Sequence, residues 1–521
     1  MGLGFVSVSQ GHSGPAPRSM LMMITPLPAA EGGRRAAEAR LAAIDPVRYG
    51  ATRNHLDGAV TRLSPYIRHG VLTLAEVREA VFARLAALDP SDAAAGALQG
   101  ELFNPSGTSP GGAGRSWSVA QRRAGERLIN ELGWRDYWQR LWIQLGDGIW
   151  SDREPLKTGH PPDAYGPQLP ADLTAANTGL ACIDAFAAEL LGSGWLHNHA
   201  RMWLAAYVVH WRRVRWQAGA RWFLQHLLDG DPASNNLSWQ WVASSFSHKP
   251  YIFNRANLER FSGGRYCATC PKAQQGCPFE GSYEALQARL FRPHDPRAEV
   301  SPPPLPAAPP ADGAALPPGS TSGPPLQRPL VWVHGEALGP ANPALRSHPE
   351  APALFVFDTE LIAGHTATTG GFPSSGGFPS SDGFPSSDGF PSSGGFPSSG
   401  GLPTSGGLAA AGLTAAPLAP GRLRFLRDCL AELPVHVREG DVALELLAGA
   451  RIHGCDGVVT SRAVDPRFSQ IAARLSAVLP LQVLEPEPFV ALPHQGRGAP
   501  DLRRFSRYWR RAEPLVWSQP R

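Results

Sequence analysis

The stretch that decides the fold is residues 213–254, which read RVRWQAGARWFLQHLLDGDPASNNLSWQWVASSFSHKPYIFN. Its apolar residues recur at helical spacing, yet they enclose two carboxylates, Asp229 and Asp231, and two adjacent amides, Asn235 and Asn236. Tryptophans at this spacing usually pack in a core, and an Asp-Gly-Asp turn usually ends a helix. That interpretation leaves the polar side chains unexplained, because buried amides and carboxylates need hydrogen-bonding partners. We therefore infer helices that surround a bound polar ligand.

The surrounding sequence divides at a proline-rich segment. Residues 29–295 have helical periodicity without an alternating strand pattern, and residues 1–28 are expected to be a disordered leader. Residues 296–328 contain SPPPLPAAPPADGAALPPGSTSGPP, which cannot bury a core and is expected to form an extended linker. The sequence therefore predicts a multi-domain protein that begins with an all-α domain.

Beyond the linker, residues 329–494 predict a Rossmann-like α/β domain with a parallel sheet, because short apolar runs alternate with helical periods. The expected strands are Leu330–Val333, Ala353–Phe357, Val435–Val437, Gly457–Thr460 and Leu481–Leu484. The expected helices are Arg422–Leu433, Val442–Ala450 and Pro466–Leu479. A GGFPSS repeat at residues 369–407 is rich in Gly, Pro and Ser and is expected to be a disordered insertion.

Composition excludes several classes of protein. The 521 residues are 43% hydrophobic and include 15 Trp, which excludes a disordered or fibrous chain. The net charge of +4 is too small to mark the whole chain as an electrostatic nucleic-acid binder. No run of about 18 apolar residues occurs, so we expect no membrane-spanning helix. Three of the six cysteines lie within residues 267–277, which favours a reducing compartment and a soluble, cytoplasmic protein.

Four motifs resemble, in order, the FAD-binding domain of the photolyase/cryptochrome family. They are TRLSPYIRHGVL (residues 61–72), NELGWRDYW (130–138), HNHARMW (197–203) and DGDPASNNLSWQW (229–241). The resemblance covers residues 40–260 and implies a helical domain that holds a U-shaped FAD. Residues 61–64 match the family's phosphate loop, although Val60 occupies its first position and lacks a hydroxyl.

The resemblance also implies which residues contact FAD. Asp229 and Asp231 match the pair that contacts the ribose and the flavin ring, and Asn235 matches the residue that faces flavin N5. The full set of implied FAD-binding positions is Tyr49, Thr61, Arg62, Leu63, Ser64, Arg135, Asn198, Asp229, Asp231 and Asn235.

A second set of matching residues implies a substrate pocket, into which photolyases flip a pyrimidine dimer. The implied catalytic positions are Glu131, Trp134, Asn198, Met202 and Trp241. The two Trp would stack on the flipped bases, and Glu131 would hydrogen-bond their edges and stabilise the radical anion of the dimer. Taken alone, Glu131 could equally be a helix-surface carboxylate. Enzymes for the (6-4) lesion place two His where this chain has Asn198 and Met202, which favours the cyclobutane dimer.

Two tryptophans match the electron-transfer chain through which the family photoreduces its flavin. Trp239 and Trp216 match the two nearer members, and core packing is the alternative for both. The outer position falls at residues 163–165 and holds no Trp, so Tyr165 or another aromatic side chain would have to substitute.

The clustered cysteines form a separate hypothesis. Cys267, Cys270 and Cys277 follow a C-x2-C-x6-C spacing, and Cys182 lies where cluster-containing photolyases have a distant fourth ligand. Four thiolates suit a [4Fe–4S] cluster or a structural zinc ion. The spacing of the trio departs from that of bacterial cluster-containing enzymes, so a cluster, zinc and no metal all remain open, with the cluster favoured.

The α/β segment resembles the antenna domain of the same family, which is normally N-terminal. The match is PLVWVHGEALGPANPAL at residues 329–345, where His334–Ala337 replace the usual Arg-Asp-Leu-Arg. The order of the two domains is therefore swapped, and an antenna chromophore or a scaffold without one both remain open. Residues 495–521 form a basic tail that either contacts DNA or, as we expect, forms a helix packed on the sheet.

The resemblance thus implies a blue-light-dependent lyase that splits cyclobutane pyrimidine dimers by electron transfer from reduced FAD. Its expected partner is UV-damaged DNA, with no membrane or protein partner. One alternative is a cryptochrome-like photoreceptor that binds FAD without repairing DNA, and another is a scaffold that has lost its flavin. Glu131, Trp134 and Met202 favour repair, and Asp229 and Asp231 count against loss of flavin.

Overall fold

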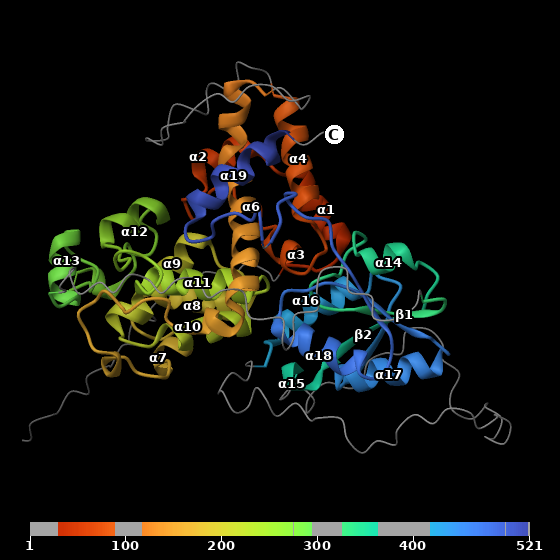
Figure 1. Ribbon diagram of the computed structural model, residues 1–521. Coiled ribbons are helices and arrows are strands. Elements are labelled where there is room, and N and C mark those ends of the chain that lie inside the picture. Colours follow the sequence, from red (N-terminus) through yellow and green to blue (C-terminus); the bar gives the residue numbers. More distant parts are fainter. Residues whose placement is uncertain are drawn as a thin grey trace, which may run out of the picture.

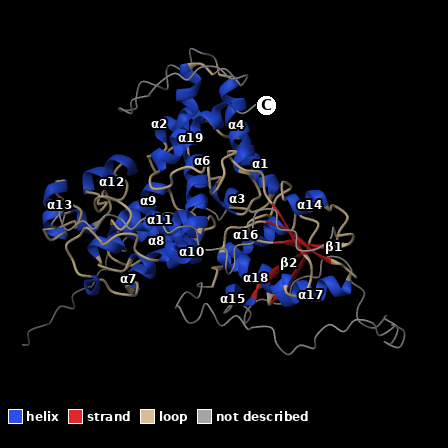
Figure 2. Cartoon of the chain, viewed as in Figure 1, coloured by secondary structure: helices blue, strands red, loops and turns tan. Residues whose placement is uncertain are grey.

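The computed structural model describes residues 30–88, 117–274, 276–293, 326–362, 417–494 and 496–518. The predicted leader, nearly all of the linker and the GGFPSS repeat lie outside these residues. Helices fill the first part of the chain, and the strands gather in the second part (Figures 1 and 2).

The first part contains the helices of the expected all-α domain. Their bounds are α1 Arg34–Ala42, α2 Pro46–Thr52, α3 Ser64–Arg68, α4 Leu74–Ala86, α6 Val119–Leu145, α7 Ala171–Thr174, α8 Ala181–Ser193, α9 Asn198–Ala206, α10 Trp216–His226, α11 Pro232–Ala243, α12 Arg255–Ser262 and α13 Tyr283–Leu290. Short 3-10 turns lie at Gly146–Trp150, Pro162–Ala164 and Pro271–Ala273, and a π-helical turn at Tyr207–Trp211 continues α9.

The 27-residue helix α6 is the centre of this domain. Its N-terminus is fixed by a capping box, in which Ser118 accepts the N–H of Gln121 and Gln121 accepts the N–H of Ser118. Helices α2, α4 and α11 pack against it. Gly125 admits Leu85 of α4 so closely that a Cβ atom would lie 2.4 Å from its side chain. Glycine at this position lets the Leu85 side chain pack directly against the α6 backbone.

The second part is a five-stranded, all-parallel sheet in the order β3-β2-β1-β4-β5, which confirms the predicted Rossmann-like topology. Its strands are β1 Pro329–Val333, β2 Ala353–Asp358, β3 His436–Gly440, β4 Gly457–Ser461 and β5 Leu481–Leu484. Its helices are α14 Pro343–Ser347, α15 Thr359–Ile362, α16 Pro420–Leu430, α17 Val442–Ile452 and α18 Pro466–Ser476. β1, β2 and β4 are buried along their whole length, as expected of central parallel strands.

The C-terminal helix α19, Phe505–Ser518, corrects one expectation from the sequence. A helix does form, but it packs on α6 of the all-α domain and not on the sheet (Figure 1). Trp509 lies against Gly133 of α6, where a Cβ atom would lie 2.2 Å from its ring. The Tyr508 hydroxyl donates to Asp136 of α6 over 2.6 Å. Gly133, which makes room for the Trp509 ring, and Asp136, which accepts the Tyr508 hydroxyl, both belong to α6. These two contacts hold the C-terminal helix on α6 rather than on the sheet.

The two domains meet where α3 ends against the carboxyl edge of the sheet. Arg68 pairs with Glu336, which follows β1, over 2.5 Å, and its Nε donates to the carbonyl of Gly230 over 3.1 Å. Gly70 adopts a φ of +63° and lies so close that a Cβ atom would clash with the Glu336 carbonyl. In sheets of this order, ligands usually bind outside the strand ends between β1 and β4. Here the end of α3 contacts that place.

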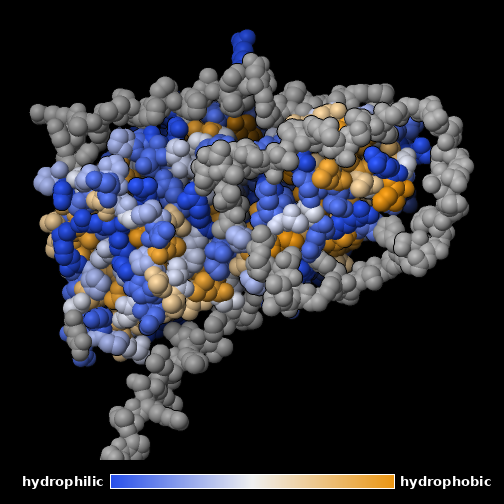
Figure 3. Space-filling view, turned by 90° about the horizontal axis from the view of Figure 1, so that it is seen from below, coloured by the Kyte–Doolittle hydropathy of each residue, from blue (hydrophilic) through white to orange (hydrophobic). Residues whose placement is uncertain are grey.

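No described helix is long and apolar enough to cross a bilayer. The face in Figure 3 intersperses hydrophilic and hydrophobic residues.

The interface ion pair yields a stability prediction. We expect Glu336→Gln to destabilise the protein by about 3 kcal/mol, because it leaves the buried Arg68 guanidinium without its nearest carboxylate. Urea denaturation measures this loss. The control is Glu485→Gln, whose partner is Arg462 and whose side chain is 46% exposed, so that little change is expected. Equal losses in the two variants would contradict a special role for Arg68–Glu336.

Candidate functional site

One cavity of about 1940 Å³ opens within the all-α domain. It exceeds the roughly 300–1000 Å³ of a pocket for a single small ligand. Its lining includes every FAD-binding and catalytic position predicted from the sequence: Tyr49, Thr61, Arg62, Leu63, Ser64, Glu131, Trp134, Arg135, Asn198, Met202, Asp229, Asp231, Asn235 and Trp241. The structure therefore brings these residues together, and their roles stay predictions.

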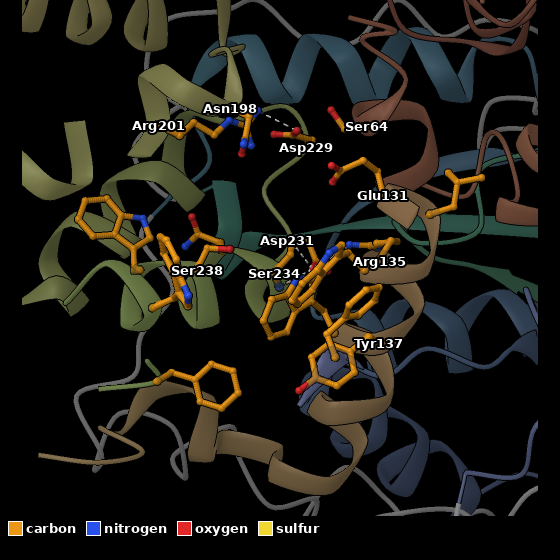
Figure 4. Close-up of a pocket in the computed structure, with 18 of the residues that line it drawn as sticks. Ser64, Glu131, Arg135, Tyr137, Asn198, Arg201, Asp229, Asp231, Ser234 and Ser238 are labelled. Carbon is orange, nitrogen blue, oxygen red and sulfur yellow. Dashed lines mark hydrogen bonds and ion pairs between the residues drawn. The ribbon is translucent and has the colours of Figure 1, made fainter. Parts of the chain in front are cut away.

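Helix α6 supplies one wall of the cavity. Glu131, Trp134, Arg135 and Trp138 all line it, because residues three and four apart share one helix face. Figure 4 shows Glu131 and Arg135 projecting from this helix. Glu131 pairs with Arg53 over 3.0 Å. Enclosure by the protein raises the pKa of the Glu131 carboxyl, and the nearby arginines oppose this rise.

Asp231 also lines the cavity, is buried with 1% of its surface exposed, and accepts several hydrogen bonds. As the N-cap of α11, it accepts the N–H of Ser234 over 2.9 Å and its hydroxyl over 2.8 Å. Arg135 of α6 pairs with it over 2.8 Å, and Gln139 donates to it over 3.0 Å. Burial by itself raises the pKa of Asp231, but Arg135 and Arg68 outweigh it, so the pKa lies below its usual range. The carboxylate therefore stays ionised and fixes Arg135 at the cavity wall.

Asp229, at the other side of the same turn, is only half satisfied. Its Oδ2 accepts from Arg201 of α9 over 2.9 Å, whereas its buried Oδ1 has no hydrogen-bond partner among the described residues. Figure 4 shows Asn198, Arg201, Asp229 and Ser64 gathered at one end of the cavity. Burial raises the pKa of Asp229, but Arg201 and Ser64 outweigh this and lower it overall. An ionised oxygen that lines a cavity without a partner is an acceptor available to a bound ligand.

The predicted phosphate loop has an unusual backbone. Arg62 adopts a φ of +52°, a region that side chains other than glycine rarely enter. Its guanidinium lies over the ring of Trp195, 4.1 Å from the centroid. Helix α3 begins two residues later, at Ser64. Arg62, Leu63 and Ser64 all line the cavity.

The third wall comes from α10 and α11. The Asn235 amide donates to the backbone carbonyl of Ala220 over 3.1 Å and to the side-chain oxygen of Asn236 over 3.0 Å. Trp239 is buried and lines the cavity, and it packs against Gly219, whose Cβ would lie 2.2 Å from its ring.

Behind Trp239, the other predicted electron-transfer residues lie in the same apolar cluster. Trp216 is buried there, at the start of α10, away from the cavity lining. Tyr165 belongs to the cluster too, and its hydroxyl hydrogen-bonds Thr158 over 2.7 Å. Tyr165 is 4% exposed, so this aromatic side chain does not reach the surface.

Sequence reasoning missed several lining residues. Arg201 lies inside the quoted HNHARMW motif, but only the folded structure shows that it donates a hydrogen bond to Asp229. Arg153 and Lys157 also line the cavity and give no sequence signal. Residues 499–505 of the tail contribute a further stretch, which the mixture of arginines and aromatics in LRRFSRYWRR did signal. Basic side chains therefore outnumber acidic ones around the cavity.

The four cysteines of the metal hypothesis line a second, very small cavity of about 10 Å³. Cys182, Cys267, Cys270 and Cys277 converge there from α8 and from the loops around Pro271–Ala273. Burial and the neighbouring thiols raise the pKa of Cys182. In the described part of the chain, no three His, Cys, Asp or Glu side chains are arranged as ligands of a single metal ion.

The fold and the cavity define a helical domain with one large cavity lined by basic, acidic and aromatic side chains. Residues 128–263 match the family model described as the FAD binding domain of DNA photolyase. This part of the chain is therefore similar to the FAD-binding domain of the photolyase/cryptochrome family.

Curated relatives agree. The chain is 38% identical over 121 residues to the deoxyribodipyrimidine photo-lyase of Streptomyces griseus, covering 23% of this chain and 26% of that one. It is 34% identical over 145 residues to the enzyme of the same name from Escherichia coli, covering 25% and 28%. The chain thus spans about a quarter of the length of these relatives.

Two solved structures are also similar. A bacterial class III photolyase from Agrobacterium tumefaciens has 22% identity and a TM-score of 0.34, covering 50% of this chain and 51% of that one. A cryptochrome from Synechocystis has 22% identity and a TM-score of 0.35, covering 45% and 44%.

The residues present fit FAD. The unpartnered Oδ1 of Asp229 is an acceptor for a hydroxyl or ring N–H, and the basic lining suits a pyrophosphate. The cavity volume leaves room for a second ligand beside the dinucleotide.

This arrangement predicts the effect of Asp229→Asn. We expect the affinity for FAD to fall by about tenfold or more, because the variant loses the charge that holds Arg201. Fluorescence titration of the flavin-free protein measures it. The matched control is Asp172→Asn, which breaks a similar pair with Arg212 outside the cavity. Unchanged affinity in the Asp229 variant would remove this carboxylate from the flavin site.

Proposed function

We propose that this protein is a blue-light-dependent DNA repair flavoenzyme that splits cyclobutane pyrimidine dimers by electron transfer from reduced FAD. The observation that carries the proposal is that the flavin set and the substrate set line one cavity. A lesion flipped into that cavity would lie directly beside the flavin. The basic side chains at its rim suit the phosphates of UV-damaged DNA.

The part of the cavity proposed to bind the substrate is lined by aromatic side chains. Trp134 comes from α6, and Trp241, which is 42% exposed, comes from the end of α11. An exposed Trp that lines a cavity is suited to stack on a flipped base, and Met202 offers an adaptable apolar contact beside it. Glu131 lines the same cavity, where its carboxyl is placed to hydrogen-bond a pyrimidine edge.

The flavin side is polar. When bound, reduced FAD supplies the light-driven electron. Asp229 and Asp231 orient the turn that contacts it, and Arg135 and Arg201 are held in place by these carboxylates. Asn235 also lines the cavity, and its amide N–H groups are already bonded to Ala220 and Asn236, so its side-chain oxygen is the group left to accept a hydrogen bond.

The lesion that fits is the cyclobutane dimer. Its cleavage needs no general acid, and the chain has Asn198 and Met202 where the resemblance places histidines for the (6-4) lesion. His197 also lines the cavity, but burial and the neighbouring His199 and Arg201 lower its pKa to about 4. It is therefore neutral at neutral pH and a poor proton donor.

We also propose roles for the remaining parts. The α/β domain acts as a scaffold, because Arg68 and His69 of the all-α domain contact the strand ends where a chromophore would otherwise bind. The four converging thiols hold a [4Fe–4S] cluster, which iron and acid-labile sulfide analysis of the purified protein tests.

Glu131→Ala tests the repair proposal. We expect light-dependent repair of a dimer-containing oligonucleotide to fall by about tenfold or more, because the variant removes the hydrogen bond that stabilises the developing charge. Flavin absorbance should be unchanged. Glu126→Ala, an exposed residue on the same helix, is the control. Bound flavin without repair in the unaltered protein would instead identify a photoreceptor.

Trp239→Phe tests the electron route. We expect slower photoreduction of the bound flavin, because Trp239 lines the cavity and belongs to the same buried cluster as Trp216. Bleaching of the oxidised flavin bands under anaerobic blue light measures the rate. Trp222→Phe is the control, since Trp222 is buried on α10 but does not line the cavity. A rate that only the control lowers would place the route elsewhere.

A further inference from the structure

The chain leaves the sheet after β5 and returns to the all-α domain. Arg140 of α6, 2% exposed, donates to the carbonyls of Val490 and Leu492 over 3.1 and 3.0 Å. Arg78 of α4 donates to the carbonyl of Phe489 over 2.8 Å. Because these buried guanidinium groups donate to backbone carbonyls, they fix the path of residues 489–492.

The following residues are fixed as firmly, beside the cavity wall. Tyr137 donates its hydroxyl to the carbonyl of Leu502 over 2.8 Å. Asp136, which also pairs with Arg140 over 2.5 Å, accepts the hydroxyl of Tyr508. Gly133, directly before Trp134 in the sequence, makes room for the ring of Trp509. Both flanks of Phe505 are therefore anchored to α6.

Phe505 stacks on the predicted base-stacking tryptophan. Its ring lies 3.8 Å from that of Trp134 between centroids, at an interplanar angle of 9°. Tyr137 meets both rings edge-on, at 5.6 and 5.7 Å. Phe505 and Trp134 both line the cavity and both are only half-buried. The stacked ring therefore sets the plane of Trp134 while part of Trp134 stays open to the cavity.

A cation accompanies this pair. Arg503 and Arg507 both pair with Asp501 over 2.7 Å. Arg504 lines the cavity and is exposed, and no described residue forms an ion pair with its side chain. A cation without a counterion at the mouth of a cavity suits a backbone phosphate.

We propose that residues 501–507 complete the substrate side of the cavity, with Phe505 as a positioning residue for Trp134 and Arg504 as a contact to a DNA phosphate. This inference rests on the proposed function. The substrate site is then shared between α6 and a segment that follows the α/β domain in the sequence.

Phe505→Ala tests the positioning role. We expect the dimer-containing oligonucleotide to bind about tenfold more weakly in the dark, because Trp134 loses the ring that sets its plane. FAD affinity and the flavin spectrum should not change. Phe505→Tyr, which keeps a stacking ring, should restore binding. The matched control is Phe468→Ala, which removes a ring stacked on Trp332 at 5.1 Å in the α/β domain and should leave DNA affinity unchanged.

Arg504→Gln tests the phosphate contact. We expect weaker binding of damaged and undamaged oligonucleotides alike, and a slope of log affinity against log salt that is smaller by about one. Arg510→Gln, an exposed arginine of α19 outside the cavity lining, is the control and should keep the slope.

The outcomes separate the two levels of the argument. If the unaltered protein repairs dimers and both variants bind DNA as it does, the inference on residues 501–507 is overturned while the proposed function stands. If the unaltered protein holds flavin but neither binds nor repairs damaged DNA, the proposed function fails first. Weaker binding by Phe505→Ala, restored by Phe505→Tyr, supports the positioning role.

Discussion

The Arg68 guanidinium is the interaction on which the rest of the structure depends. It donates to the carbonyl of Gly230, between Asp229 and Asp231, and pairs with Glu336 of the α/β domain. Burial by itself lowers the pKa of Arg68, but Glu336 and Asp231 outweigh it and raise it. A buried cation needs such partners. One side chain therefore joins the turn of the proposed flavin site to the second domain.

The same contact fixes the all-α domain against the α/β domain. Glu336 lies where the resembling antenna domains have a different tetrapeptide, and here it serves the interface. Arg422 of α16, whose pKa burial and Arg68 lower to about 9, approaches the Gly230 carbonyl from the same side. Glu336, through Arg68, and Arg422 thus link the α/β domain to the backbone of the Asp229–Asp231 turn. The same turn lines the cavity.

Helix α6 is the second constraint on the structure, because one of its faces lines the cavity and another binds the C-terminal helix. One face presents Glu131, Trp134 and Arg135 to the cavity. An adjoining face, made by Gly133 and Asp136, receives the C-terminal helix. The residues that shape the proposed lesion pocket are thereby fixed by a segment more than 350 positions away in the sequence.

The sequence by itself determined the local elements and indicated which side chains line the cavity. Periodicity located the strands and helices, since it reflects which side chains must be buried, and the four motifs contain all the predicted cavity-lining residues except Tyr49. Tertiary structure alone decided the pairing of Arg201 with Asp229, the bracing by Arg68, and the docking of α19 on α6 instead of the sheet. These contacts depend on shape and on buried charges that meet only in the folded chain, and no local pattern records them.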